Sequence, residues 1–93
     1  MGLLLAACEA PPQTCLFVSD CAAGSACVDD PTYTGPVRFC GKGLCGVECR
    51  PKCVGTPLSG RAECGAAELC LNEVIHTSFD QVPVCAPASW KKQ

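Results

Sequence analysis

The sequence lacks the features that mark several large classes of protein. Its 93 residues contain no apolar run near the ~18 residues of a transmembrane helix. Aromatic residues make up 5% of the chain and charged residues 17%. Only three Arg and four Lys stand against nine acidic residues, and the net charge of −2 argues against a nucleic-acid binder.

The sequence also lacks the residue spacings of common catalytic and metal sites. No two cysteines have the C-x-x-C spacing of zinc ribbons and thioredoxin-like redox centres. The only histidine, His76, lies in a polar loop beside Ser78 and Asp80, and a loop this small cannot hold a catalytic triad in place. We interpret His76 as a solvated loop residue and expect no catalytic residues, no metal and no cofactor. The chain is therefore not predicted to be an enzyme.

Cysteine, in contrast, is abundant. Eleven residues, about 12% of the chain, are Cys, which is typical of a disulfide scaffold. Leu, Ile, Val and Phe together number only 20. Their burial cannot offset roughly 1.5 kcal/mol of ordering entropy per residue, so covalent bridges must contribute. Bridges of this kind predict an oxidising compartment.

The cysteines form an internal repeat, in which residues 20–28 align with residues 63–71. Each copy has an acidic residue, Cys, five residues, Cys and an aliphatic residue. A further Cys lies upstream, and another follows a downstream apolar segment. The two predicted sets are Cys15, Cys21, Cys27 and Cys40, and Cys53, Cys64, Cys70 and Cys85. The fold class expected is small and disulfide-rich, with two tandem four-cysteine modules, short β-hairpins and mostly irregular backbone.

The repeat divides the chain into segments. They are a truncated signal-like leader (1–7), a Pro-containing tether (8–14), module one (15–40), a Gly/Cys connector (41–52), module two (53–85) and a tail (86–93) that we expect to fray. Within the modules, apolar residues predict strands that begin at Val28 and at residues 71–75, with returning strands at 37–39 and 82–84. Residues 22–26 and 66–69 could each form one helical turn. The Gly-rich connector offers little apolar surface to couple the modules.

Equivalent cysteines in two copies should pair alike. Interleaved bridges would cross each module, and each would contribute on the order of 3 kcal/mol. A bridge from Cys21 to Cys27 would leave the hairpin arms loose. The expected pairs are Cys15–Cys27, Cys21–Cys40, Cys45–Cys49, Cys53–Cys70 and Cys64–Cys85.

The N-terminal stretch Leu5-Ala6-Ala7-Cys8 resembles the lipobox of bacterial lipoproteins. The resemblance implies that Cys8 is acylated and becomes the new N-terminus after cleavage. The odd cysteine count independently leaves Cys8 without a partner. No Lys or Arg precedes Cys8 and the apolar run is short, which a start upstream of Met1 would explain. Without acylation, Cys8 would be a free or intermolecular thiol.

The segment Asp20-Cys21-Ala22-Ala23-Gly24-Ser25-Ala26-Cys27 resembles the cysteine-rich repeats of bacterial surface lipoproteins of the myxobacterial type. More loosely, the chain is similar to animal modules of the Dickkopf or EB kind. These resemblances imply export and a stapled fold, and they imply no activity.

Charge is segregated along the chain. Residues 36–61 carry five basic residues and one acidic residue, whereas residues 9–30 and 62–85 carry acidic residues alone. The basic centre could pair with the acidic modules on either side. It could also bind an anionic envelope polymer or lipid headgroup.

The function expected is that of an exported, envelope-anchored lipoprotein acting as a binding or structural module. Its partners would be the membrane, through the lipid anchor, and an unidentified protein or envelope polymer. The loops at 29–36 and 72–81 are candidate contact surfaces, with Tyr33, Arg38, His76 and Phe79 as candidate binding residues. One alternative is a secreted protease-inhibitor or toxin-like miniprotein. Another is a cytosolic thiol or metal-binding protein, if Met1 is the true start.

The cysteine arithmetic predicts the redox state of the mature protein. Five bridges remove ten hydrogens, so the intact mass without reductant should be about 10 Da below that of the fully reduced chain. Native mass spectrometry measures the difference. Stoichiometric zinc or iron would contradict this prediction.

Overall fold

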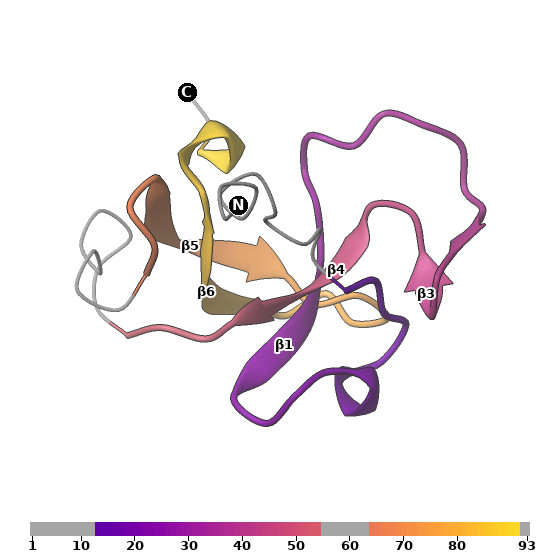
Figure 1. Cartoon of the computed structure of the whole chain (residues 1–93), viewed down its shortest axis with the longest axis horizontal. Coiled ribbons are helices and arrows are strands. Elements are labelled where there is room, and N and C mark those ends of the chain that lie inside the picture. Colours follow the sequence, from indigo (N-terminus) through magenta and orange to yellow (C-terminus); the bar gives the residue numbers. More distant parts are fainter. Residues whose placement is uncertain (1–12, 55–63, 92–93) are drawn as a thin grey trace, which may run out of the picture.

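Short antiparallel strands make up the regular structure of the chain. The computed structural model describes residues 13–54 and 64–91. Within these ranges, β1 (Ser25–Asp29) pairs with β4 (Val47–Pro51), β2 (Phe39–Cys40) with β3 (Gly43–Leu44), and β5 (Glu68–Val74) with β6 (Gln81–Pro87) (Figure 1). Two single 3₁₀ turns, η1 (Val18–Asp20) and η2 (Ala88–Trp90), are the only helical segments described. The prediction of a small, disulfide-rich fold with short β-hairpins is confirmed.

Facing cysteines occupy matching positions in the two larger ladders. Cys27 lies opposite Cys49 in β1–β4, and Cys70 lies opposite Cys85 in β5–β6. Residues directly opposite each other in an antiparallel pair point to the same face of the ladder. Both bridges of a ladder therefore lie on one face.

The five disulfides correct part of the expected pairing. The bridges Cys15–Cys27, Cys53–Cys70 and Cys64–Cys85 are as predicted. The predicted pairs Cys21–Cys40 and Cys45–Cys49 are wrong, because Cys21 bonds Cys49 and Cys40 bonds Cys45. The physical reason is register: Cys49 shares a face with Cys27, whereas Cys40 and Cys45 lie on the separate β2–β3 hairpin.

The strand that returns against β1 also differs from the prediction. Residues 37–39 were expected to pair with the strand that begins at Val28, but β4 takes that place. β4 forms five residue pairs with β1 and buries Val47. Val37, which follows two prolines in the connecting loop, remains 85% exposed. In the second ladder the predicted pairing of residues 71–75 with 82–84 is confirmed for Leu71 to Glu73.

Tight turns replace the predicted helical turns in front of β1 and β5. The Ser25 N–H donates to the Ala22 carbonyl, and the Glu68 N–H donates to the Gly65 carbonyl, both at 3.1 Å. A single helical turn fixes several dihedral angles for one hydrogen bond. Because β1 and β5 begin directly after these turns, the same residues form strand pairs instead. The positive φ of Gly24 (87°) accommodates the first turn.

The residue before the first cysteine of each set bridges the outer edge of the returning strand. Thr14 bridges to Glu48 on β4, and Lys52 bridges to Val84 on β6. The next N–H also corresponds, since Cys15 donates to Val47 and Cys53 donates to Pro83, both at 3.1 Å. The two ladders thus share their turns, their bridge positions and their edge contacts.

The hydrophobic core lies between the two ladders, on the faces opposite the disulfides. Because strand side chains alternate, Ala26 and Val28 point away from Cys27. They form a cluster with aliphatic residues of β5 and β6 and with the Trp90 ring. The buried members are Ala26, Val28, Leu71, Val84, Ala86 and Trp90. Separate sulfur-rich clusters, around Cys15 and Cys27 and around Cys53, Cys70 and Cys85, flank this core.

This shared core corrects two expectations. The two halves are coupled by apolar packing, and also by a β-bridge between Val28 and Ile75. The tail was expected to fray, but Ala86 and Trp90 are only 0% and 4% exposed. The residues that couple the two halves lie on β1, β5 and β6, so the coupling does not depend on the apolar content of the connector.

The shared core predicts how loss of a bridge spreads. The Cys21–Cys49 bridge spans 28 residues and Cys40–Cys45 spans five. In the chain-entropy model, Cys21→Ser/Cys49→Ser should lower the free energy of unfolding by about 3–4 kcal/mol, and Cys40→Ser/Cys45→Ser by about 2 kcal/mol. Urea unfolding followed by Trp90 fluorescence measures both. Because Trp90 belongs to the second half of the chain, an unchanged transition in Cys21→Ser/Cys49→Ser would show that the halves unfold independently.

Candidate functional site

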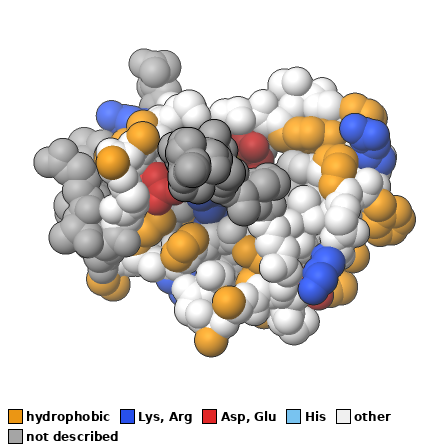
Figure 2. Space-filling model, in the orientation of Figure 1, with side chains coloured by type: hydrophobic (Ala, Val, Ile, Leu, Met, Phe, Trp, Pro, Cys, Tyr) orange, Lys and Arg blue, Asp and Glu red, His pale blue; other side chains and the backbone are white. Residues whose placement is uncertain are grey.

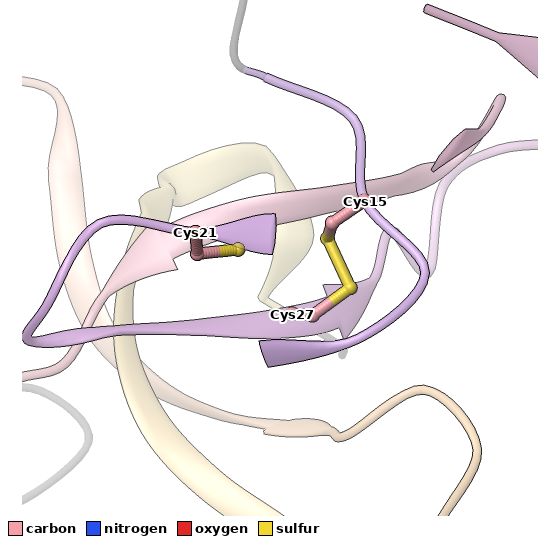
Figure 3. A group of neighbouring side chains, drawn as sticks. All are labelled: Cys15, Cys21 and Cys27. Carbon is pink, nitrogen blue, oxygen red and sulfur yellow. A yellow bond between two sulfur atoms is a disulfide. The ribbon is translucent and has the colours of Figure 1, made fainter. Parts of the chain in front are cut away.

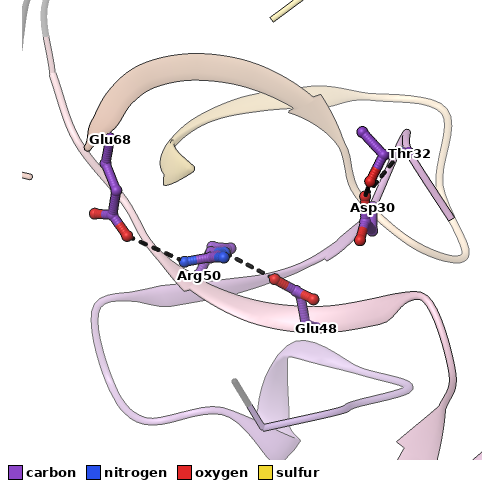
Figure 4. Close-up of polar contacts among 5 residues, drawn as sticks. All are labelled: Asp30, Thr32, Glu48, Arg50 and Glu68. Carbon is purple, nitrogen blue, oxygen red and sulfur yellow. Dashed lines mark hydrogen bonds and ion pairs between the residues drawn. The ribbon is translucent and has the colours of Figure 1, made fainter. Parts of the chain in front are cut away.

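Arg50 lies at the centre of a charged cluster between the two ladders. Strand alternation places Glu48 and Arg50 of β4 on the inner face, beside Val28 and Ala26 of β1. The Arg50 Nε lies 2.9 Å from Glu48 Oε2, and its Nη1 lies 3.3 Å from Glu68 Oε2 on β5 (Figure 4). The guanidinium carbon is 5.2 Å from the centroid of the Trp90 ring, a cation–π distance. One side chain thus contacts both ladders and the C-terminal turn.

The environment of this cluster shifts the pKa of one carboxyl. Burial raises the pKa of Glu48, and the charge of Asp30 raises it further, while Arg50 acts in the opposite direction. The Glu48 side chain is 14% exposed and that of Arg50 13%. Charges this sheltered need partners, and Arg50 supplies one to Glu48 and one to Glu68. The cluster connects the two halves of the molecule and leaves little of its charge open to a ligand.

A second carboxyl organises the segment before β1. The Asp20 side chain accepts hydrogen bonds from the N–H groups of Leu16 and Phe17, at 2.9 and 3.0 Å. These bonds lower the pKa of Asp20, and the nearby charge of Lys42 adds to the effect. Asp20 therefore has a local structural role.

His76 is not the solvated loop residue that the sequence predicted. Its Nδ1 lies 2.8 Å from Asp29 Oδ1 on β1, and its backbone N–H donates to the Cys27 carbonyl at 3.0 Å. The nearby Ser78 hydroxyl accepts a hydrogen bond from the Asp80 N–H. The imidazole joins the β5–β6 connection to β1, where it assists the packing of the two halves.

The second candidate loop is shorter than predicted. Residues 72–74 and 81 belong to β5 and β6, so the connection spans residues 75–80. Backbone hydrogen bonds close it, from Ile75 to Asp80 and from Ser78 to Ile75. The Phe79 side chain is 100% exposed and is the one predicted binding residue of this loop that remains available for contact.

The first candidate loop is ordered by its own polar groups. Asp30 Oδ1 accepts from the N–H and the hydroxyl of Thr32, at 2.8 and 2.6 Å. The Tyr33 hydroxyl donates to the Pro36 carbonyl at 2.8 Å. A side chain at Gly35 or at Gly46 would collide with the Tyr33 ring, so Tyr33 packs on the loop backbone. Tyr33 therefore holds the loop in shape, and Arg38 is exposed beyond it.

The outward residues of this region include two that the sequence analysis did not single out. Val37 is 85% exposed and Phe39 is 77% exposed, on either side of Arg38. Lys42 is also exposed, at the tip of the β2–β3 hairpin. The sequence contained a signal for this surface: Val37 and Phe39 alternate with the cation Arg38 between Gly35 and Cys40. It was interpreted instead as a strand that returns against the strand beginning at Val28.

Cysteine sulfurs approach each other closely in both halves. The Sγ atoms of Cys15, Cys21 and Cys27 lie within 4.8 Å of one another (Figure 3). The same holds for the Sγ atoms of Cys53, Cys64 and Cys85. All six sulfurs belong to disulfides, whereas metals bind the thiolate. The close approach follows from two bridges packed side by side on one face of a ladder.

Comparison with known proteins adds no assignment: no family model, no curated protein and no solved structure matches the chain. In the part of the chain that the structure describes, no helix has the length and apolar character to cross a membrane.

The predicted acylation site, Cys8, lies outside the described residues. The exposed residues around Arg38, together with Phe79, are the candidate contact surfaces.

The raised pKa of Glu48 predicts a pH dependence of stability. A carboxyl with a folded pKa above its unfolded value of 4.5 binds its proton more tightly in the folded protein. The free energy of unfolding should therefore fall as the pH rises from about 4.5 through the raised pKa. Glu48→Gln should remove this fall, because it removes the titrating group. Urea unfolding between pH 4 and 7, followed by Trp90 fluorescence, measures the slope.

The matched control is Glu68→Gln, which removes the other carboxylate on Arg50 and leaves the burial of Glu48, the main cause of the shift, in place. Asp20 does not interfere, since its pKa is lowered from 3.8 and its effect falls at more acidic pH. An unaltered pH slope in Glu48→Gln would refute the assignment.

Proposed function

We propose that the chain is an exported, disulfide-stapled lipoprotein of the cell envelope, anchored through Cys8 and acting as a binding or structural module. The observation that carries the proposal is the set of five bridges, which uses ten of the eleven cysteines and leaves Cys8. Five bridges in a chain of this size are typical of an oxidising, extracellular or envelope environment. A cysteine with no partner in such a chain is suited to a separate modification.

The body of this lipoprotein would consist of two copies of one four-cysteine module. The first copy would contain Cys15, Cys21, Cys27 and Cys49, and the second Cys53, Cys64, Cys70 and Cys85. The equal turns, facing cysteines and edge contacts of the two ladders support this division. On this interpretation, the loop and hairpin between β1 and β4 are an insertion in the first copy, closed by Cys40–Cys45.

A binding role is supported by the construction of that insertion. Hydrogen bonds of Asp30 and Tyr33 shape its loop, and the Cys40–Cys45 bridge staples its hairpin. Exposed apolar side chains held in a fixed shape lose little entropy when a partner covers them. Val37 and Phe39 are such side chains.

Protease inhibition, the alternative that the sequence left open, is less well supported by the same loop. An inhibitor must present the carbonyl of its primary residue to the oxyanion hole of the protease. The Arg38 carbonyl instead accepts a hydrogen bond from the Cys45 N–H at 3.0 Å. We therefore favour the anchored binding module.

The anchor is tested by Cys8→Ser, expressed from the native locus. The unaltered protein should partition into the detergent phase and carry a diacyl modification, because the acyl chains dominate its membrane affinity. Cys8→Ser should move to the aqueous phase with the same disulfide map. Detergent partitioning, intact mass and non-reducing peptide mapping measure the three properties. An unaltered protein that is aqueous and unmodified would overturn the anchor.

A further inference from the structure

Two strongly exposed apolar side chains of the insertion, Val37 and Phe39, lie on a stapled hairpin that we call the finger, residues 37–45. It contains β2, β3 and the Cys40–Cys45 bridge. Hydrogen bonds hold its two arms together, since Phe39 pairs with Leu44 and the Cys45 N–H donates to the Arg38 carbonyl. The tip is a turn at Gly41 and Lys42, with a positive φ of 60° at Gly41. The backbone of the finger is therefore held in one shape, with Gly43 buried against the backbone of Cys15.

The surface of the finger combines apolar and cationic side chains. Val37 and Phe39 are 85% and 77% exposed, and Arg38 and Lys42 are exposed beside them. Residues 37–45 contain no Asp or Glu. Figure 2 shows hydrophobic and basic side chains gathered at the edge of the molecule where β3 lies in Figure 1. Apolar side chains combined with cations, without an acidic residue between them, suit an anionic interface.

The finger also lies where the chain enters the folded body. The Thr14 hydroxyl donates to the Cys40 carbonyl and accepts from the Gly43 N–H at 3.3 Å. Thr14 is six residues after Cys8, which at full extension spans at most about 22 Å. Cys40 and Gly43 flank the turn, so a protein anchored at Cys8 would hold the tip of the finger within this distance of the bilayer surface.

From these observations we propose that the finger docks on an anionic lipid surface, with Val37 and Phe39 in the interface and Arg38 and Lys42 at the headgroups. This inference rests on the proposed anchor for its geometry. The chemistry favours lipid over other partners. An anionic polymer would attract the two cations but would gain nothing from the apolar side chains, whereas a lipid surface interacts with both. A finger of nine residues offers less area than a standard protein–protein interface.

The test uses the Cys8→Ser protein, so that the finger is measured without an acyl chain. Sedimentation with phosphatidylglycerol-rich vesicles at millimolar lipid should show binding, and phosphatidylcholine vesicles should bind much less. Arg38→Gln/Lys42→Gln should weaken binding to the anionic vesicles about 25-fold, since one cation near an anionic surface contributes about fivefold. Val37→Ser/Phe39→Ser should weaken it at least about tenfold.

Matched controls lie elsewhere on the molecule. Phe79→Ser removes a fully exposed aromatic side chain from the β5–β6 connection, and Lys52→Gln/Lys91→Gln removes two exposed cations. Neither should change vesicle binding by more than about twofold, because neither is part of the finger. Non-reducing peptide mapping confirms that each variant keeps its five bridges.

The outcomes separate this inference from the proposed anchor. No sedimentation of Cys8→Ser with anionic vesicles overturns the finger, even if Cys8 is acylated in the cell. Binding that depends on the cations but not on Val37 and Phe39 also overturns it, in favour of an anionic polymer. Finger-dependent binding in a protein that is not acylated in the cell would refute the anchor and retain the lipid-docking surface.

Discussion

The pair of cysteines that face each other across each ladder is the constraint on which the rest of the structure depends. Cys27 opposite Cys49, and Cys70 opposite Cys85, send their bridges to one side of the strands. The upstream segments that carry Cys15, Cys21, Cys53 and Cys64 must then cover that side. The other side remains free for aliphatic residues, and two such sides packed together give the core around Val28 and Val84. A chain with few large apolar residues can form a stable body in this way, because the bridges limit the entropy of the unfolded chain while a small core joins the halves.

The polar contacts between the ladders complement this core. Arg50 bonds Glu48 on its own strand and Glu68 on β5, and stacks over Trp90. His76, in the β5–β6 connection, adds a contact to Asp29 at the end of β1. These residue types are often catalytic, yet here each has a structural partner. The side chains left for recognition are the exposed ones on rigid connections, above all Val37, Arg38 and Phe39. Four bridges thus support the small core of the two ladders, and a fifth, Cys40–Cys45, fixes the shape of a contact surface.

Several features followed from the sequence because they depend on local spacing. The acidic-Cys-x5-Cys-aliphatic repeat located β1 and β5, and it led to three of the five disulfides. In the second half only one apolar segment, residues 82–84, precedes the last cysteine, so the hairpin was unambiguous. In the first half, residues 37–39 were predicted to return against β1 and Cys40 was paired with Cys21. The structure gives both roles to β4, with Cys49 as the partner of Cys21. The candidate surface was recognised in Arg38, but Val37 and Phe39 were assigned to the strand that returns against β1.

The sequence by itself determined the class of the protein, its dependence on disulfides and the two-fold repetition of its cysteine pattern. These follow from composition and from separations of a few residues. Only the tertiary structure decided which strand pairs with β1, that Trp90 belongs to the core, and that Arg50 joins the two halves. Those outcomes depend on which face each strand turns toward its neighbour. The face that a strand presents depends on its register with its partner. For β1 and β4, register is set by packing between segments that residues 30–46 separate in the sequence.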